Sequence, residues 1–186
     1  MAFFIKSCAS NKDWPQDEKK EICFIGRSNV GKSSLINALA NAKIAKTSNT
    51  PGRTQLANFY DFDNFRLIDL PGYGYAKIDK KKHHELSKII SEYIYLRSNL
   101  ICVYQIIDIS VITDLDIQMA KLFSERFANH IIVLNKIDKQ NKSYFDNNIS
   151  KITKLLNKDK ELFIPVSSKN KTNLHILKKN ILEMVK

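Results

Sequence analysis

The feature that most constrains this chain is the eight-residue stretch from Gly26 to Ser33, which has the spacing G-x-x-x-x-G-K-S. It follows an apolar run, Ile22–Ile25, that we expect to be a buried strand, and it precedes a segment of helical periodicity that begins near Leu35. A strand, a glycine-bounded loop and a helix form the context of a phosphate-binding loop, because backbone N–H groups and the positive end of the helix then point at an anion. The sequence therefore predicts a site for a nucleoside phosphate.

Two residues of this loop have roles that follow from phosphate chemistry. We expect the ammonium group of Lys32 to reach the β- and γ-phosphates, and the hydroxyl group of Ser33 to bind Mg²⁺. A glycine-rich turn before an ordinary helix is the simpler alternative, but the complete pattern between a strand and a helix argues against it. The loop alone does not say which base the nucleotide carries.

Strand patterns alternate with helix patterns along the rest of the chain, which is typical of a doubly wound α/β sheet. A turn at Asp63-Asn64 joins two of the strands into an antiparallel hairpin. We therefore predict a P-loop nucleoside-triphosphatase G domain, with three αβα layers around a mostly parallel six-stranded sheet that contains one antiparallel strand. In chain order, the strands are expected at residues 21–26, 56–62, 65–69, 100–107, 130–134 and 162–165, and the helices at 31–41, 86–97, from 113, 143–157 and from 172.

Local patterns also predict helix starts, buried faces and one long loop. Thr113 with Asp116 has the spacing of a capping box, and Thr172 is expected to cap the last helix. Apolar residues at helical spacing, including Leu122 and Leu155, are expected to face the core. Residues 42–55 are rich in Thr, Ser, Asn, Pro and Gly with little periodicity, which predicts a mobile loop.

We expect one domain over residues 1–186, with an N-terminal arm over 1–20 and the nucleotide-binding core over 21–186. The arm begins with a strand or extended segment near Phe3–Ile5, which is too short for a secretory leader because Lys6 interrupts it. No apolar run approaches the length of a membrane span. These features predict a cytoplasmic monomer without a membrane partner.

The charge balance is strongly basic, since 30 Lys and Arg residues against 19 Asp and Glu residues give a net charge of +11. A polyanionic partner such as nucleic acid would suit this surface. Lys, Asn and Ile are abundant throughout, as in proteins from AT-rich genomes, so compositional bias is an alternative source of the lysines. Cys8, Cys23 and Cys102 lie far apart, which fits a reducing compartment and predicts neither a disulfide framework nor a metal site.

Three further short motifs each follow a predicted strand, at the edge where ligands of such folds bind. The Asp of Asp69-Leu70-Pro71-Gly72 would hold Mg²⁺ through water, and the Gly N–H would contact the γ-phosphate. In Asn135-Lys136-Ile137-Asp138, the final carboxylate can accept the N1–H and N2–H groups of guanine, and adenine presents no such pair. A backbone N–H of Ser167-Ser168-Lys169 can contact guanine O6. Four motifs in this order predict a GTP-binding domain.

The motifs resemble those of the EngB (YsxC, YihA) family of bacterial GTPases over roughly residues 21–180. The similar stretches run from Gly26 to Asn37, from Thr50 to Gln55 and from Asp69 to Ala76, and the most specific are G-R-T-Q and D-L-P-G-Y-G-Y-A. The resemblance implies a cytoplasmic GTPase that assists assembly of the large ribosomal subunit. It also implies a link to normal cell division and septation.

The resemblance and the motifs together give the expected site. Lys32, Thr54 and Gly72 are the expected catalytic residues, and Ser33, Thr54 and, through water, Asp69 are the expected Mg²⁺ ligands. The role of Thr54 comes from the resemblance, since the residues alone leave Thr47, Thr50 and Thr54 as equal candidates. The expected GTP-binding residues are Gly26, Arg27, Ser28, Asn29, Val30, Gly31, Lys32, Ser33, Ser34, Gly52, Arg53, Thr54, Gln55, Leu56, Asp69, Leu70, Pro71, Gly72, Asn135, Lys136, Ile137, Asp138, Val166, Ser167 and Ser168.

The chain departs from the family pattern at two positions. Asn135 stands where the family commonly has Thr, but this is the form general to GTPases, and Asp138, which would select guanine, is kept. Asn173 stands where the family usually has Gly before the last helix. Because Asn tolerates the left-handed backbone region better than other non-glycine residues, we expect this turn to survive.

The residue after D-x-x-G is Tyr73, whereas Ras-like enzymes place a Gln there to orient the attacking water. We therefore expect slow intrinsic hydrolysis, on the order of 10⁻⁴–10⁻³ s⁻¹. A catalytic group from a partner or a monovalent cation would accelerate it. Asn29 resembles the Asn of potassium-activated GTPases, so one hypothesis makes it a K⁺ ligand, and the other is that it only shapes the loop.

A run of basic residues, Lys77, Lys80–Lys82, His83 and His84, follows the same motif. A solvated helix start is its usual explanation. We favour a surface that the nucleotide state orders and that meets ribosomal RNA phosphates, because the γ-phosphate reorganises the adjacent segment in such proteins. The expected partners are therefore GTP or GDP and a precursor of the large ribosomal subunit. The alternative is a nucleotide-sensing switch that binds a protein effector without contact to the ribosome.

Overall fold

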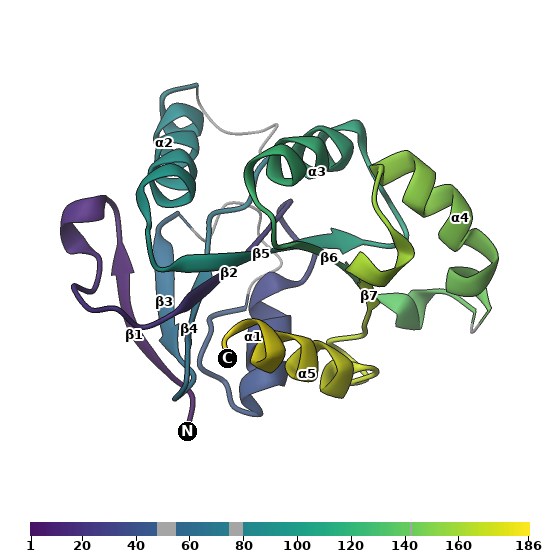
Figure 1. The fold of residues 1–186 in the computed structure, drawn as a ribbon, viewed down its shortest axis with the longest axis horizontal. Helices are drawn as coiled ribbons and strands as arrows, with labels where there is room; N and C mark the ends of the chain where they lie inside the picture. Colours follow the sequence, from purple (N-terminus) through teal and green to yellow (C-terminus); the bar gives the residue numbers. More distant parts are fainter. Residues whose placement is uncertain (48–54, 75–79, 142) are drawn as a thin grey trace.

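A seven-stranded sheet with helices on both faces forms the centre of the computed structural model, which describes residues 1–47, 55–74, 80–141 and 143–186 (Figure 1). The strands are β1 (Phe3–Cys8), β2 (Glu21–Gly26), β3 (Ala57–Asp61), β4 (Arg66–Asp69), β5 (Leu100–Asp108), β6 (His130–Asn135) and β7 (Phe163–Pro165). The helices are α1 (Lys32–Ala40), α2 (Lys80–Leu96), α3 (Asp114–Arg126), α4 (Tyr144–Leu156) and α5 (Leu174–Met184). Short 3₁₀ turns are η1 (Asn11–Asp13), η2 (Ile137–Lys139) and η3 (Lys160–Leu162).

The strand order is β1-β3-β4-β2-β5-β6-β7. Strand β3 runs antiparallel to both of its neighbours, and the other pairings are parallel. The predicted fold class and its single reversed strand are therefore confirmed. The sheet has seven strands rather than six, because the expected N-terminal arm adds β1 to the free edge of β3.

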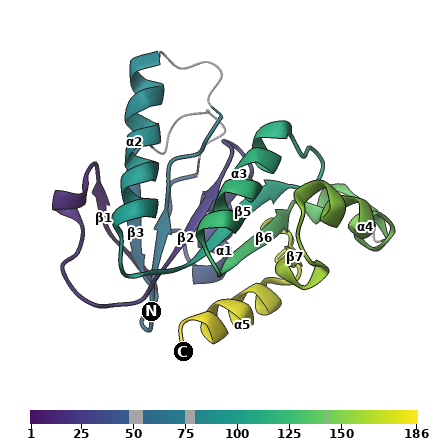
Figure 2. The same ribbon diagram turned by 45° about the horizontal axis from the view of Figure 1, so that its top comes forward.

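The two faces of the sheet are covered by different helices. Helices α1 and α5 pack on one face, whereas α2, α3 and α4 pack on the other, as Figures 1 and 2 show. A strand covered on both faces carries a near-continuous apolar run. This explains β5, in which all but the first two residues and the last are buried. The predicted capping box of Thr113 and Asp116 is present at the start of α3.

The prediction that Thr172 caps the last helix is wrong. The N-cap of α5 is Asn173, whose φ of 58° lies in the left-handed region. A β-branched residue is disfavoured there, and the backbone carbonyl of Thr172 instead accepts the Ser167 N–H at 3.1 Å. The side-chain amide of Asn173 donates to the Pro165 carbonyl at 2.9 Å, so the expected tolerance of Asn at this turn is confirmed.

Two apolar side chains predicted to be buried are exposed, Leu122 and Leu155, each at 42%. On α3, the core takes Phe123, and Leu122 lines an apolar groove of about 290 Å³ between α2 and α3. Helix α4 lies at the β6–β7 end of the sheet and buries only a narrow stripe that ends at Leu156. On both helices, the apolar face predicted from helical spacing is therefore wider than the face that packs against the core.

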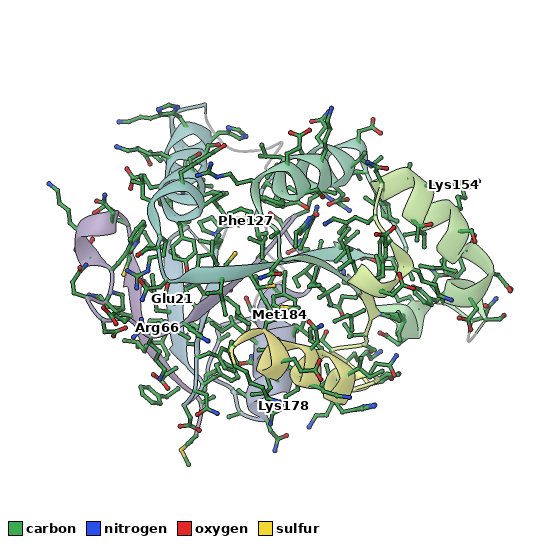
Figure 3. All side chains as sticks on the ribbon, in the orientation of Figure 1. Glu21, Arg66, Phe127, Lys154, Lys178 and Met184 are labelled. Carbon is green, nitrogen blue, oxygen red and sulfur yellow. The ribbon has the colours of Figure 1, made fainter. Side chains whose placement is uncertain are left out.

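The N-terminal arm is tied to the sheet through the buried carboxylate of Glu21, which is labelled beside Arg66 in Figure 3. Glu21 accepts hydrogen bonds from Arg66 at 2.7 Å, from Arg97 at 2.5 and 2.7 Å, and from the Tyr93 hydroxyl at 2.8 Å. Arg97 also donates to the Pro15 carbonyl of the arm. The cluster joins the arm, β2, β4 and the end of α2.

Within the described residues, no helix has both the length and the apolar character needed to cross a bilayer.

Candidate functional site

The loop between β2 and α1 has the backbone of a phosphate-binding loop. Gly31 caps α1 with a φ of 99°, and a Cβ there would lie 2.5 Å from Asn135 Nδ2. At the start of the loop, a Cβ on Gly26 would lie 2.2 Å from the Ile106 carbonyl oxygen. Asn29 is the other loop residue in the left-handed region, with a φ of 64°. The glycines of the motif are therefore required by close packing at both ends and by the backbone conformation at Gly31.

Lys32 lies folded back over this loop. Its ammonium group donates to the Gly26 carbonyl at 3.2 Å, and the side chain is buried. Burial lowers the pKa of Lys32 from its usual value, while the negative charge of Asp69 opposes that shift. An ammonium group held at the loop by its own carbonyls is placed to meet phosphate charge.

Ser33 and Asp69 form the expected metal side of the site. The Ser33 hydroxyl donates to Asp69 Oδ2 at 3.2 Å, and the carboxyl group is 1% exposed. Burial raises the pKa of Asp69 to about 6, against the opposing influence of Lys32 and of the Ser33 hydrogen bond. Asp69 Oδ1 is buried with no hydrogen-bond partner among the described residues. A desolvated carboxylate oxygen beside a hydroxyl group fits a divalent cation, which would supply the missing charge.

The expected switch threonine cannot be placed. Gly52, Arg53 and Thr54 lie outside the described residues, as do residues 75–79 after the D-x-x-G motif. The next two expected nucleotide residues, Gln55 and Leu56, line a cavity of about 610 Å³ together with Ser33 and Asp69. Gln55 and Leu56, which follow Thr54 in the sequence, therefore lie on the metal side of the site.

Asn135 joins the phosphate loop to the guanine motifs. Its amide donates to the Val30 carbonyl at 2.9 Å, and its side-chain oxygen accepts the Ser168 N–H at 3.1 Å. Lys136 adds a second connection, because its ammonium group donates to the Asn29 carbonyl at 2.6 Å and pairs with Asp108 at 2.8 Å. The structure thus brings together the first, third and fourth motifs that the sequence predicted at separate strand ends.

Asp138 is oriented by the last motif. The Ser167 hydroxyl donates to Asp138 Oδ1 at 2.6 Å, which fixes the orientation of this carboxylate. The backbone N–H of Ser167 donates to the Thr172 carbonyl, and that of Ser168 is used by Asn135. The guanine O6 contact from this segment stays a prediction, and Val166, fully buried, acts here as part of the core.

The turn after β4 lies directly against the phosphate loop. Leu70 is fully buried, and a Cβ on Gly72 would lie 3.0 Å from the Ser28 nitrogen. The Tyr73 N–H donates to the Gly26 carbonyl at 3.3 Å. The Tyr73 side chain is only 7% exposed, because its hydroxyl donates to Asp116 Oδ1 at 3.0 Å and accepts from Gln105 at 2.9 Å. Tyr73 is therefore an anchor in the protein interior.

Sequence reasoning missed the side chains that hold this turn. Asp116 was assigned only to the cap of α3, which the structure confirms, yet it also accepts Arg27 Nε at 2.8 Å. The sequence contains one indication of these contacts, Gln105, which lies inside the apolar run of β5. A buried amide needs hydrogen-bond partners, so polar side chains had to lie near it. The side chain of Arg27, one of the expected nucleotide-binding residues, contacts Asp116 on α3.

Known proteins are similar to this chain in sequence and in fold. A family model described as "50S ribosome-binding GTPase" matches residues 21–136. A "Probable GTP-binding protein EngB" from Malacoplasma penetrans is 76% identical over 97% of both chains, and one from Mycoplasmoides gallisepticum is 50% identical over the whole of both. The fold is similar to a crystal structure of a probable GTP-binding protein EngB, with a TM-score of 0.75 and 24% identity over 89% of this chain and 98% of that one. It is also similar to Era from Aquifex aeolicus bound to GDP.AlF4-, with a TM-score of 0.71 and 24% identity over 89% and 56%.

Proposed function

Because the chain belongs to the EngB family of GTP-binding proteins, a family of GTPases, we propose that it is a slow guanine-nucleotide switch in assembly of the large ribosomal subunit. The single observation that carries slow turnover is the buried, hydrogen-bonded side chain of Tyr73, at the position where Ras-like enzymes have the Gln that orients water. Slow turnover gives the GTP-bound form time to dock on a partner. We expect a cytoplasmic monomer whose release from that partner follows hydrolysis, with the family link to division and septation as a consequence.

The roles proposed for the phosphate-side residues rest on the motifs and, for Thr54, on the family resemblance. Lys32 contacts the β- and γ-phosphates, and the Gly72 N–H contacts the γ-phosphate. Ser33, Thr54 and, through water, Asp69 hold Mg²⁺, which fits the unpaired buried oxygen of Asp69. Bound Mg²⁺ neutralises charge on the β- and γ-phosphate oxygens. An Era protein in the same fold class was crystallised with MgGDPNP, which supports this assignment.

Guanine selection is the role we propose for Asp138. Its carboxylate is held by the Ser167 hydroxyl and accepts the N1–H and N2–H groups of the base. Asn135 and Lys136 keep this motif at a fixed distance from the phosphate loop through Val30 and Asn29. A nucleotide with adenine leaves the carboxylate unpaired, which costs several kcal/mol, on the order of 2–3.

Potassium is a second proposed cofactor, bound by the exposed side chain of Asn29 beside the β- and γ-phosphates. We expect turnover to be faster in KCl than in NaCl at equal ionic strength. Asn29→Gly should abolish that difference while keeping the loop, because Gly accepts the φ of 64°. Equal turnover of the wild type in the two salts would contradict the K⁺ role, and Asn29 would then only shape the loop.

Ribosomal RNA is the partner that the surface supports best. The net charge is +11, the matching family model is described as a 50S ribosome-binding GTPase, and α2 begins with Lys80, Lys81 and Lys82 beside the D-x-x-G segment. We expect co-sedimentation with large-subunit particles to be stronger with a non-hydrolysable GTP analogue than with GDP. Replacing Lys80–Lys82 by Ala should weaken it and flatten its salt dependence by nearly one ion per lysine.

A matched control removes three exposed lysines far from that segment, Lys151, Lys154 and Lys160, on α4 and η3. This control should bind particles like the wild type. If the two triple variants behave alike, the lysine run is only a solvated helix start. If wild-type protein sediments equally with both nucleotides or with neither, the alternative of a protein effector without ribosome contact is favoured.

A further inference from the structure

We propose that Asp116 is a positioning residue that clamps the D-x-x-G turn against the phosphate loop and thereby sets the preference for GTP over GDP. The clamp consists of Asp116, Arg27 and Tyr73. The inference rests on the proposed contact of the Gly72 N–H with the γ-phosphate, and it names the residues that hold this amide in place.

The buried carboxylate of Asp116 accepts hydrogen bonds from both Arg27 and Tyr73. Asp116 is 0% exposed, and its two oxygens are divided between the two sides. Oδ2 accepts Arg27 Nε at 2.8 Å, in addition to the capping bonds from Thr113, and Oδ1 accepts the Tyr73 hydroxyl at 3.0 Å. Charge-assisted hydrogen bonds of this kind are strong when water is excluded.

The two partners belong to the two segments that must meet around a γ-phosphate. Arg27 is the second residue of the phosphate loop and is also fixed by the Val111 carbonyl at 2.6 Å. Tyr73 follows Gly72 directly, and its backbone pairs with that of Arg27 in an isolated β-bridge. Gly72 lies so close to the loop that a Cβ would be 3.0 Å from the Ser28 nitrogen. Displacing Tyr73 would therefore move the Gly72 amide away from the loop.

The Tyr73 hydroxyl has a second fixed partner. Gln105 Nε2 donates to this hydroxyl at 2.9 Å and to the Asp116 backbone carbonyl at 2.9 Å. The other side-chain atom of Gln105 meets His130 Nε2 at 3.1 Å, and all of these side chains are buried. Loss of the Tyr73 hydroxyl would leave Asp116 Oδ1 and one hydrogen of Gln105 without this partner in the dry interior.

The clamp should act on the triphosphate alone. GDP has no γ-phosphate and makes no use of the Gly72 amide, so its affinity does not depend on where the D-x-x-G turn lies. A residue that only stabilised the fold would change the binding of both nucleotides or of neither. The ratio of the two affinities therefore separates positioning from general stability.

The experiment measures dissociation constants of GDP and of β,γ-imido-GTP, both with Mg²⁺, for the wild type, Tyr73→Phe and Asp116→Asn. We expect the variants to bind β,γ-imido-GTP about 5–10-fold more weakly, the effect of one or two buried hydrogen bonds, and GDP within about twofold of the wild type. Tyr104→Phe is the matched control, because it also removes a buried phenol hydroxyl, one that donates to Asn180 at 2.8 Å. Its affinity ratio should equal that of the wild type.

Unchanged ratios in both clamp variants, or the same loss in Tyr104→Phe, would overturn the inference. A higher preference for β,γ-imido-GTP would overturn it as well, because the clamp would then favour the diphosphate form. Tyr73→Phe removes the hydrogen bond between Tyr73 and Asp116 without changing a charge, whereas Asp116→Asn removes the charge that Arg27 contacts, so the test does not depend on the folding of the charge variant. Wild-type protein that failed to bind either nucleotide would instead contradict the nucleotide site itself.

Discussion

Tyr73 is the single residue that most separates this site from that of a Ras-like GTPase. A Gln at this position orients the attacking water in Ras-like enzymes. Here the side chain is 7% exposed and hydrogen-bonded to Asp116 and Gln105, so it is held in the protein interior although the backbone of this residue lies against the phosphate loop. Restoring the residue type should therefore not restore the activity.

We predict that Tyr73→Gln hydrolyses saturating GTP no faster than the wild type. The variant should also lose about 2–4 kcal/mol of unfolding free energy, because it removes a buried ring and its hydrogen bonds. Single-turnover hydrolysis and denaturant unfolding measure the two quantities. An increase in the hydrolysis rate of about tenfold or more, equivalent to a barrier lower by about 1.4 kcal/mol, would show that the side chain reaches the water after all.

His130 makes the fold sensitive to acid. Burial, reinforced by the positive charge of Lys158, lowers the pKa of His130 from 6.5 to about 3. The unfolded chain therefore binds a proton near pH 6.5 that the folded protein does not accept until far lower pH. The stability from the neutral imidazole is fully present above pH 6.5 and is lost as the pH falls, by about 2 kcal/mol at pH 5.

We predict that His130→Gln removes this part of the pH dependence. Asp69 acts in the opposite direction, because its raised pKa of about 6 makes stability fall as the pH rises between about 4 and 6. The informative quantity is therefore the wild-type unfolding free energy minus that of His130→Gln. This difference should fall by about 2 kcal/mol from pH 7 to pH 5. A difference that stays constant would mean that the pKa of His130 is the same in the folded and in the unfolded chain.

A functional residue can be predicted from the sequence when the residues that it acts with lie close to it along the chain. Gly31, Lys32 and Asp138 belong to short motifs in which the residue types and spacing already contain the chemistry. Tyr73 and Asp116 are 43 positions apart, and neither segment carries a pattern that points to the other. Tertiary hydrogen bonds of this kind follow only from the register of β2 with β5 and from the direction of α3.

Among the elements, strand β2 carries a functional or charged feature at each of its ends. Its last residue opens the phosphate loop, and its first, Glu21, is a fully buried carboxylate between Arg66 and Arg97. The side chains of these arginines are 5% and 7% exposed, and Arg97 pairs with Glu21, whereas Arg66 pairs with both Glu21 and Asp17. Removing one member of a buried ion cluster leaves an unpaired charge and costs more than the pair itself contributes.

We predict that Glu21→Gln lowers the free energy of unfolding by about 3–5 kcal/mol, as measured by denaturant titration. Glu183→Gln is the matched control, because Glu183 is paired with Lys179 at 3.9 Å on the exposed face of α5. Its cost should be within about 0.5 kcal/mol of zero. Equal costs for the two variants would mean that the buried cluster contributes no more than a surface ion pair.

The bounds of an element can be predicted from the sequence where polarity changes sharply. They cannot be predicted so where a residue with a positive φ determines where the element begins. Strand β2 was predicted at residues 21–26 and is observed there, because an apolar run lies between charged residues and a glycine loop. The cap of α5 was assigned to Thr172 because Thr is a good capping side chain. The turn requires a positive φ instead, and Asn173 satisfies it.

For the whole molecule, periodicity and motif order are enough to predict the layered α/β fold, but not the width of the sheet. The six core strands carry apolar runs or alternation, whereas β1 exposes most of its side chains and pairs only with β3. An edge strand is specified by backbone hydrogen bonds to its neighbour more than by its own pattern. Whether the arm is part of the cooperative fold is therefore a question of energetics.

Trp14, the chain's single tryptophan, reports on the arm directly. It is 8% exposed, with its ring 5.5 Å from that of Tyr93 on α2 and with the Arg97 guanidinium 5.5 Å above it. Burying such a ring contributes on the order of 3 kcal/mol, so the arm should not detach before the core unfolds. We predict a blue-shifted native emission and a fluorescence transition in denaturant that coincides with that of far-ultraviolet circular dichroism. A fluorescence midpoint at lower denaturant would mean that the arm, with β1, unfolds first and that the six remaining strands hold the site alone.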